Sequence, residues 1–310
     1  TQTLTVDSAA PTVTITDDQA AVTVNGDITF TITFSEEVSG FTASDITVAN
    51  GTAGTFTQTS PTTYTLVVTP DAGLADNVSV GVAANIAADL AGNNNTAATT
   101  ATQAVDTAAP SAPVITGITT PNSDSTPTIT ITAEAGSTVT VYANGAVLAG
   151  NITEVSGTFT FTPTAGLPDG NYRITATAED AVGNVSAEAT VQDVVIDAVQ
   201  AGVPVIASTS LTNDTTPVIS GTAEVGSSVN VTLGSGANTS TWTVVATDGR
   251  WSIDTGVAST STAGTGHTIA VNGANAVSVT ATDSAGNVSA AATQTLTVDS
   301  AAPTVTITDD

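Results

Sequence analysis

Eighteen residues at the start of this chain are repeated without change at its end. The string Thr-Gln-Thr-Leu-Thr-Val-Asp-Ser-Ala-Ala-Pro-Thr-Val-Thr-Ile-Thr-Asp-Asp occupies residues 1–18 and again residues 293–310. A compact catalytic domain has no physical reason to begin and end on one string, whereas a tandem array does. We therefore expect one period of a repetitive protein followed by the start of the next period.

Shorter marks divide this period into three units. A Val-Asp-(Ser/Thr)-Ala-Ala-Pro string contains Asp7, Asp106 and Asp299, and a degenerate Ile-Asp-Ala copy contains Asp197. The spacing of roughly 90–100 residues suits one small β domain per interval. We predict units at residues 8–106, 107–197 and 198–299. Residues 1–7 would end a preceding linker, and residues 300–310 would start the next repeat.

The segments between the marks have the pattern of half-buried strands. Residues 28–34, 138–142, 158–161 and 172–178 alternate between apolar and polar side chains, and Gly, Pro, Asn and Asp separate them. No helix is expected. About seven strands per unit predict an all-β chain of tandem immunoglobulin-like β-sandwiches, arranged as an extended rod.

The charge balance narrows the set of possible partners. The chain has 28 acidic residues against two arginines, no lysine and a net charge of −26. Nucleic acids and anionic lipids need a basic surface, so we expect neither nucleic-acid binding nor membrane insertion. Such a chain should attract cations and remain monomeric. Cys is also absent, which excludes disulfides and leaves bound metal as the available staple.

The acidic residues recur at positions that an immunoglobulin-like sandwich would bring to the ends of each unit. The turn Asp-x-x-Gly-Asn precedes three of the linker marks, and a Thr-Ala-Glu string occurs in the second and third units. At the ends facing the incoming linker, the predicted ligand sets are Asp7, Glu36 or Glu37, and Asp89; Asp106, Glu134 and Asp180; and Asp197, Glu224 and Asp283. At the opposite ends we predict Asp124 and Asp169 near Asp197, Asp214 near Asp299, and Asp71 and Asp76 near Asp106.

Carboxylates gathered without a lysine either protonate or hold a cation. Hard oxygen ligands in a flexible cluster suit Ca²⁺ better than Mg²⁺ or a transition metal. The sequence therefore predicts calcium at the junctions, where it would bind linker and sandwich together. The alternative is that these residues are only turn formers and solubilising charge.

Catalytic chemistry has little support. The single histidine, His267, lies in a Gly/Thr/Ser-rich stretch and is expected at the surface. Pairs of carboxylates recur in every unit, whereas a catalytic pair would not need to occur three times. Trp251 alternates like a buried strand residue, whereas Trp242 could lie on an exposed face and stack on a sugar.

These strings resemble the bacterial immunoglobulin-like repeats of giant adhesins secreted by Gram-negative bacteria. Residues 107–299 are similar throughout, and residues 8–106 resemble a related variant marked by Phe-Ser-Glu-Glu-Val-Ser-Gly-Phe at 34–41. The resemblance implies a stalk exported by type I secretion to the cell surface, with Ca²⁺ stiffening the linkers and neighbouring repeats as partners. The implied function is that of a structural extender for a distal adhesive domain in attachment or biofilm formation. The alternative is a ligand- or glycan-binding module within the adhesin.

Overall fold

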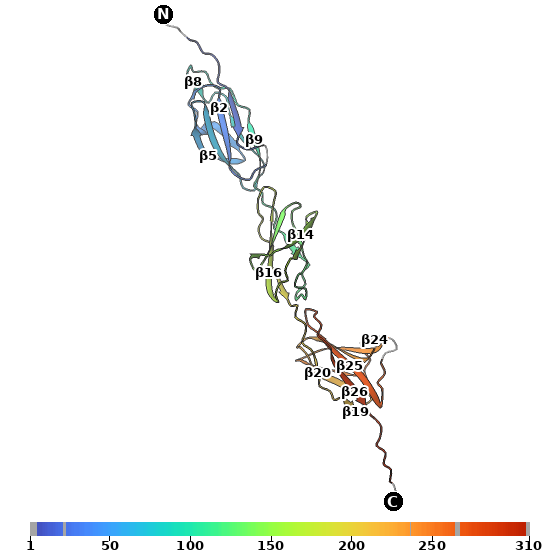
Figure 1. The fold of residues 1–310 in the computed structure, drawn as a ribbon. Helices are drawn as coiled ribbons and strands as arrows, with labels where there is room; N and C mark the ends of the chain where they lie inside the picture. The colour runs from blue at the N-terminus through green and yellow to red at the C-terminus, as the bar shows by residue number, and fades with distance from the viewer. Residues whose placement is uncertain (1–4, 21–22, 236, 264–266, 308–310) are drawn as a thin grey trace.

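The computed structural model describes residues 5–20, 23–235, 237–263 and 267–307. The outermost residues of both terminal segments, 1–4 and 308–310, thus lie outside the described part. Three β-sandwiches follow one another along the molecule, and the first and third lie at its opposite ends (Figure 1). Within the described residues the helical structure is one 3₁₀ turn, η1 (Ala43–Asp45), and no helix could cross a membrane.

Nine strands lie among the described residues of the first unit. Its strict alternation at Ile28–Phe34 is confirmed, because every second side chain of β2 is buried. The main sheets have the orders β1-β2-β6-β5 and β4-β7-β9, and β3 pairs with β8. The strands are β1 (Val13–Asp17), β2 (Ile28–Phe34), β3 (Val38–Ser39), β4 (Ile46–Ala49), β5 (Gly51–Gln58), β6 (Thr63–Pro70), β7 (Ala75–Val82), β8 (Ala88–Asp89) and β9 (Ala101–Asp106).

The second unit packs two four-stranded sheets against each other, with the orders β10-β11-β15-β14 and β13-β12-β16-β17. The Tyr172 hydroxyl donates to the backbone oxygen of Pro168 at 2.8 Å, which is the corner contact typical of immunoglobulin-like sandwiches. The strands are β10 (Val114–Thr116), β11 (Ile129–Thr132), β12 (Thr138–Ala143), β13 (Ala146–Val147), β14 (Gly150–Val155), β15 (Thr158–Pro163), β16 (Gly170–Glu179) and β17 (Gln192–Ile196).

The third unit has one larger sheet. A three-stranded sheet with the order β18-β20-β23 faces a six-stranded sheet with the order β19-β26-β25-β21-β22-β24. Its strands are β18 (Val205–Ile206), β19 (Leu211–Thr212), β20 (Val218–Thr222), β21 (Ser228–Ser235), β22 (Asn238–Val245), β23 (Arg250–Asp254), β24 (Ser261–Ala263), β25 (Gly273–Thr282) and β26 (Ala292–Val298). Short strands of two or three residues raise the number per unit above the seven expected from the pattern.

Each unit has its own hydrophobic core. The first core draws on residues from Val13 to Val105 and is rich in aromatic side chains, whereas the second runs from Ile115 to Ile196 and the third from Ala201 to Leu296. Separate cores leave the linkers as the places where neighbouring units must be held to one another. We call the end of each unit that receives the incoming linker its N-terminal pole.

Candidate functional site

The Asp-x-x-Gly-Asn turn has the same hydrogen bonds in all three units. In the second unit, Asp180 Oδ1 accepts from the backbone N–H groups of Val182 and Asn184 at 2.9 Å, and its Oδ2 accepts from Asn184 Nδ2 at 2.7 Å. Gly183 takes a φ of 93°, which a residue with a side chain rarely adopts. The turns at Asp89 and Asp283 repeat these contacts. The carboxylate of each turn therefore stabilises the turn by accepting hydrogen bonds from within it.

These hydrogen bonds set the charge state of the turn aspartates. The side-chain amide of Asn93, helped by backbone N–H groups, holds the pKa of Asp89 below its usual 3.8. Burial acts to raise the pKa of Asp180 and Asp283, but the hydrogen bonds from Asn184, Asn287 and the backbone outweigh it and lower both. All three turns are thus most stable with an ionised carboxylate.

The asparagine that closes each turn also holds the linker. An amide nitrogen carries two hydrogens, and the second is donated to the backbone oxygen of the linker aspartate. Asn93 Nδ2 lies 3.2 Å from the Asp7 oxygen, Asn184 Nδ2 lies 2.9 Å from that of Asp106, and Asn287 Nδ2 lies 2.7 Å from that of Asp197. We call this contact the asparagine latch. Sequence reasoning noted the Gly-Asn turn but missed this role, although its signal was the Asn that follows Gly in every copy.

The carboxylates of the linker aspartates mostly serve their own turns. Asp7, Asp106 and Asp299 each accept from the backbone N–H two residues ahead, at 3.0–3.1 Å. The linker at Asp197 has a different contact, in which the N–H of Ala198 donates to Asp169 Oδ1 at 2.9 Å. Asp169, predicted to lie near the second linker, therefore contacts it directly.

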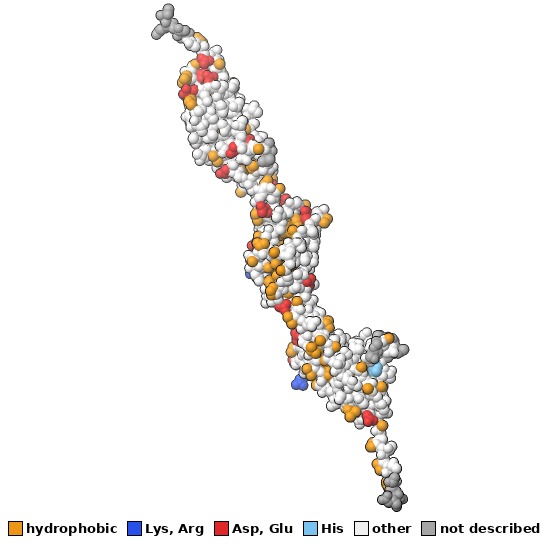
Figure 2. All heavy atoms as spheres, viewed as in Figure 1, with side chains coloured by type: hydrophobic (Ala, Val, Ile, Leu, Met, Phe, Trp, Pro, Cys, Tyr) orange, Lys and Arg blue, Asp and Glu red, His pale blue; other side chains and the backbone are white. Residues whose placement is uncertain are grey.

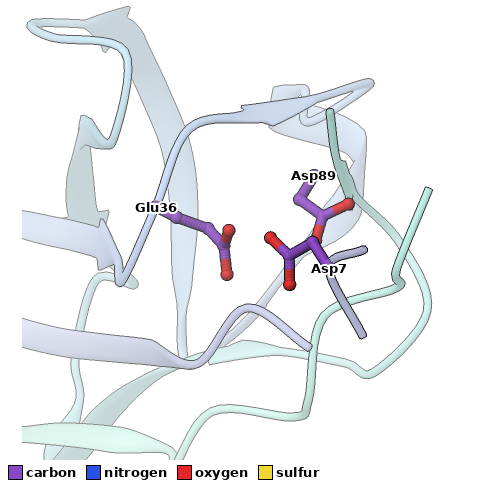
Figure 3. A group of neighbouring side chains, drawn as sticks. All are labelled: Asp7, Glu36 and Asp89. Atoms are coloured by element: carbon purple, nitrogen blue, oxygen red, sulfur yellow. The ribbon is translucent and has the colours of Figure 1, made fainter. Parts of the chain in front are cut away.

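Three carboxylates converge at the N-terminal pole of the first unit (Figure 3). The ligand atoms of Asp7, Glu36 and Asp89 all lie within 4.8 Å of one another. They come from the linker, from the loop after β2 and from β8; Asp89 is buried, Glu36 is half-buried and Asp7 is exposed. Partial burial, together with the charges of Asp7 and then Asp89, raises the pKa of Glu36 above 4.5.

This trio fits a hard divalent cation. All three side chains offer oxygen, the chain has no lysine, and the one ion pair within the described residues joins Arg173 to Asp193 in another unit. The neighbouring Glu37 does not belong to the trio; its charge adds to burial in raising the pKa of Tyr64. Of the two glutamates left open by the sequence, the geometry selects Glu36.

The other predicted ligand sets are not gathered in this way within the described residues, where the trio is the one group of this kind. The Glu134 and Glu224 side chains are exposed, and their backbone oxygens accept from Ser137 and Ser227. Asp124 and Asp214 brace the turns to Thr126 and Thr216, and the remaining pair, Asp71 and Asp76, contact Thr107 and Asn77. Calcium at the second and third poles stays a prediction.

A further contact joins the first two units directly. Asn25 Nδ2 donates to the backbone oxygen of Val182 at 2.6 Å, so a loop of unit one touches the Asp-x-x-Gly-Asn turn of unit two. On the side of the molecule shown in Figure 2, acidic side chains lie mainly toward the ends of the sandwiches, and the surface between them is largely uncharged.

Comparison with known proteins identifies the units. One family model, described as a bacterial Ig-like domain, matches residues 7–105. A second model with the same description matches residues 115–198 and 205–300. No curated protein sequence matches the chain.

Solved structures share the fold at low identity. The fibronectin(III)-like modules of CbhA from Clostridium thermocellum are 15% identical, cover 64% of this chain and 100% of their own, and superpose with a TM-score of 0.36. A marsupial T cell receptor is 12% identical, with 87% and 96% covered and a TM-score of 0.37. The Yersinia pseudotuberculosis adhesin InvE is 17% identical, with 60% and 58% covered and a TM-score of 0.24. Likenesses this remote carry no argument about function.

Proposed function

Because the chain belongs to the bacterial Ig-like domain family, we propose that it is an extender segment of a large repetitive cell-surface adhesin. Its task would be to hold a distal adhesive domain away from the cell, for attachment to cells or surfaces or for biofilm formation. Neighbouring Ig-like repeats of the same chain are its partners. Ig-like families are typically structural modules, and we assign this segment no catalytic role.

The observation that carries this proposal is the asparagine latch. The same side chain holds the incoming linker to the pole in three successive units, at 3.2, 2.9 and 2.7 Å. A module that acted alone would gain nothing from such a contact, because the latch fixes only where the chain arrives. The three units have different cores but share this one linker contact. This supports a role in which the end-to-end arrangement of the units matters.

Calcium would add to the latch at the first pole. Asp7, Glu36 and Asp89 would hold the ion, which supplies positive charge where three carboxylates otherwise repel one another. Because Asp7 belongs to the linker and the other two belong to the sandwich, the ion would cross-link them. Extracellular calcium modules bind with dissociation constants of about 10⁻⁴ to 10⁻³ M, which suits a secreted or cell-surface location.

Small-angle X-ray scattering tests the extender role. The full chain in millimolar calcium should give an elongated particle with a narrow distribution of shapes and a length on the order of 100 Å for three end-to-end units. A Gly-Gly-Ser insertion between Ala109 and Pro110 should broaden that distribution, because it adds slack between Asp106 and the unit whose Asn184 holds it. If the unaltered chain were already as broad as the insertion variant, the units would be freely hinged and the extender proposal would fail.

A further inference from the structure

The third unit has a wider sheet than the second, and a hollow lies beside it. In the second unit β12 has β13 as its outer neighbour, and the two pair only at Tyr142–Val147 and Ala143–Ala146. In the third unit the equivalent strand β21 pairs with the eight-residue β22 over its full length, and β24 pairs beyond it. The sheet is therefore wider. The described parts of the segment after β23 lie against β22.

A groove of about 510 Å³ lies between β22 and the segment that follows β23. Trp242 and Leu233 are among its apolar lining residues, and Ser and Thr residues, among them Thr216 and Ser240, make up much of the remainder, together with His267. No Asp, Glu, Lys or Arg is among its described lining residues, although the chain has 28 acidic residues. The groove is thus polar without being charged.

The indole of Trp242 is held in place. It is half-buried, and its Nε1–H donates to the backbone oxygen of Val257 at 3.0 Å. The one polar atom of the ring is therefore satisfied by the protein. Part of the indole packs against the third core, and its exposed carbon surface can contact a ligand. A ring fixed in this way loses little conformational freedom when a ligand stacks on it.

The imidazole of His267 is also oriented. Its Nε2 lies 2.9 Å from Oδ1 of Asn275, a fully buried residue whose Nδ2 donates to the backbone oxygens of Ala270 and Leu296. Because that Oδ1 also accepts from the Ala270 N–H, it acts as an acceptor, and Nε2 must carry the hydrogen. The backbone N–H of His267 donates to Ser240 Oγ, which ties it to β22.

We propose that this groove binds an uncharged carbohydrate. An indole surface suits the C–H face of a sugar ring, and Ser and Thr hydroxyls donate and accept as sugar hydroxyls do. The absence of charged lining side chains gives no attraction for an ionic ligand, and the net charge of −26 opposes an acidic glycan. The third unit would thereby add surface recognition to its place in the stalk.

The test is a titration of the full chain with neutral sugars (lactose, cellobiose, maltose and N-acetylglucosamine) and with acidic sugars (sialyllactose and glucuronic acid). Saturation-transfer NMR and tryptophan fluorescence would measure the binding. At least one neutral sugar should bind with a dissociation constant in the range of about 0.1–10 mM, and the acidic sugars should bind more weakly. Trp242→Ala should weaken binding by about tenfold or more, as truncation of a tryptophan anchor commonly does. Trp242→Phe should retain part of the affinity.

Matched variants separate the groove from the fold. Thr243→Ala changes the next residue of β22, whose side chain is exposed on the other face, and it should bind as the unaltered chain does. Ala258→Phe adds bulk at the groove lining without removing Trp242, so it should block binding even if Trp242→Ala disturbs folding. The inference is overturned if no neutral sugar binds, if Ala258→Phe binds normally, or if acidic sugars bind best. Scattering from the unaltered chain is independent of these outcomes, so the extender role can fail or stand separately.

Discussion

The N-terminal poles of the first and second units hold their linkers with the same latch but with different charges around it. At both poles an asparagine bridges a turn aspartate and the backbone of a linker aspartate. Only the first pole adds a glutamate within 4.8 Å of both carboxylates, among the residues that the structure describes. The second has Glu134 at the exposed position where the sequence predicted a ligand.

This difference separates two ways of holding a repeat to its linker. The latch is a neutral hydrogen bond that is insensitive to ions, so it can be copied into every unit. The trio at the first pole is unfavourable without a cation and favourable with one, because like charges repel until a metal neutralises them. Under the proposed calcium binding, the first pole would respond to the ion most strongly, while the latches would keep their geometry.

The largest expected effect is a calcium response that is strongest in the first unit, where three carboxylates are already gathered. At a calcium concentration of 100 times the dissociation constant, binding should stabilise that unit by about 2.7 kcal/mol relative to EGTA. Hydrogen exchange followed residue by residue by NMR would locate the change. Glu36→Gln should remove most of the response, and in EGTA it should stabilise unit one slightly because it relieves repulsion.

The control is the adjacent glutamate, which lies outside the trio. Glu37→Gln changes the net charge by the same amount and should keep the calcium response. If both variants behaved alike, or if calcium protected all three units equally, the contrast between the poles would be wrong.

Removal of one latch should have a smaller effect. Asn184→Ala deletes the hydrogen bonds to Asp180 Oδ2 and to the Asp106 oxygen, and it should destabilise unit two by about 1–2 kcal/mol. Relaxation measurements by NMR should show residues 106–113 becoming more mobile, with the linker at 197–204 unchanged. Asn151→Ala, on the exposed edge strand β14, provides the control. Equal loosening of both linkers, or an equal effect of the control, would contradict the local role of the latch.

The smallest expected effect is a difference in pH dependence, measured in EGTA. The depressed pKa values of Asp89, Asp180 and Asp283 mean that their stabilisation is present above the unfolded value of about 3.8 and is lost as the pH falls through the folded value. Glu36 has the opposite sign, since its raised pKa gives stability that is full below about 4.5 and lost as the pH rises through the folded value. Unit one should thus be most stable at mildly acidic pH, whereas units two and three only lose stability with acid. Parallel curves for all three units would contradict this.

Much of the fold could be predicted because its determinants are local. Alternation at Ile28–Phe34 requires a strand with one buried face, and the structure buries every second side chain there. The burial of Trp251, which is 3% exposed, follows from the same periodicity. His267, expected at the surface, is half-buried, because its ring contacts Asn275, a buried residue of β25. The sequence around the histidine gives no sign of this contact.

Periodicity along the chain was thus enough for the β class and for the repeated turns, since both depend on neighbours in sequence. Pairing between the strands of each sheet was decided only in three dimensions. Ile131 faces Phe159 in unit two, whereas the equivalent pair in unit three is Gly221 and Trp251, and a Cβ on Gly221 would lie 2.7 Å from the indole. The choice of Glu36 over Glu37 and the reach of each asparagine to its linker are of the same kind. They depend on distances between segments far apart in the chain, which burial and packing set and local sequence patterns do not encode.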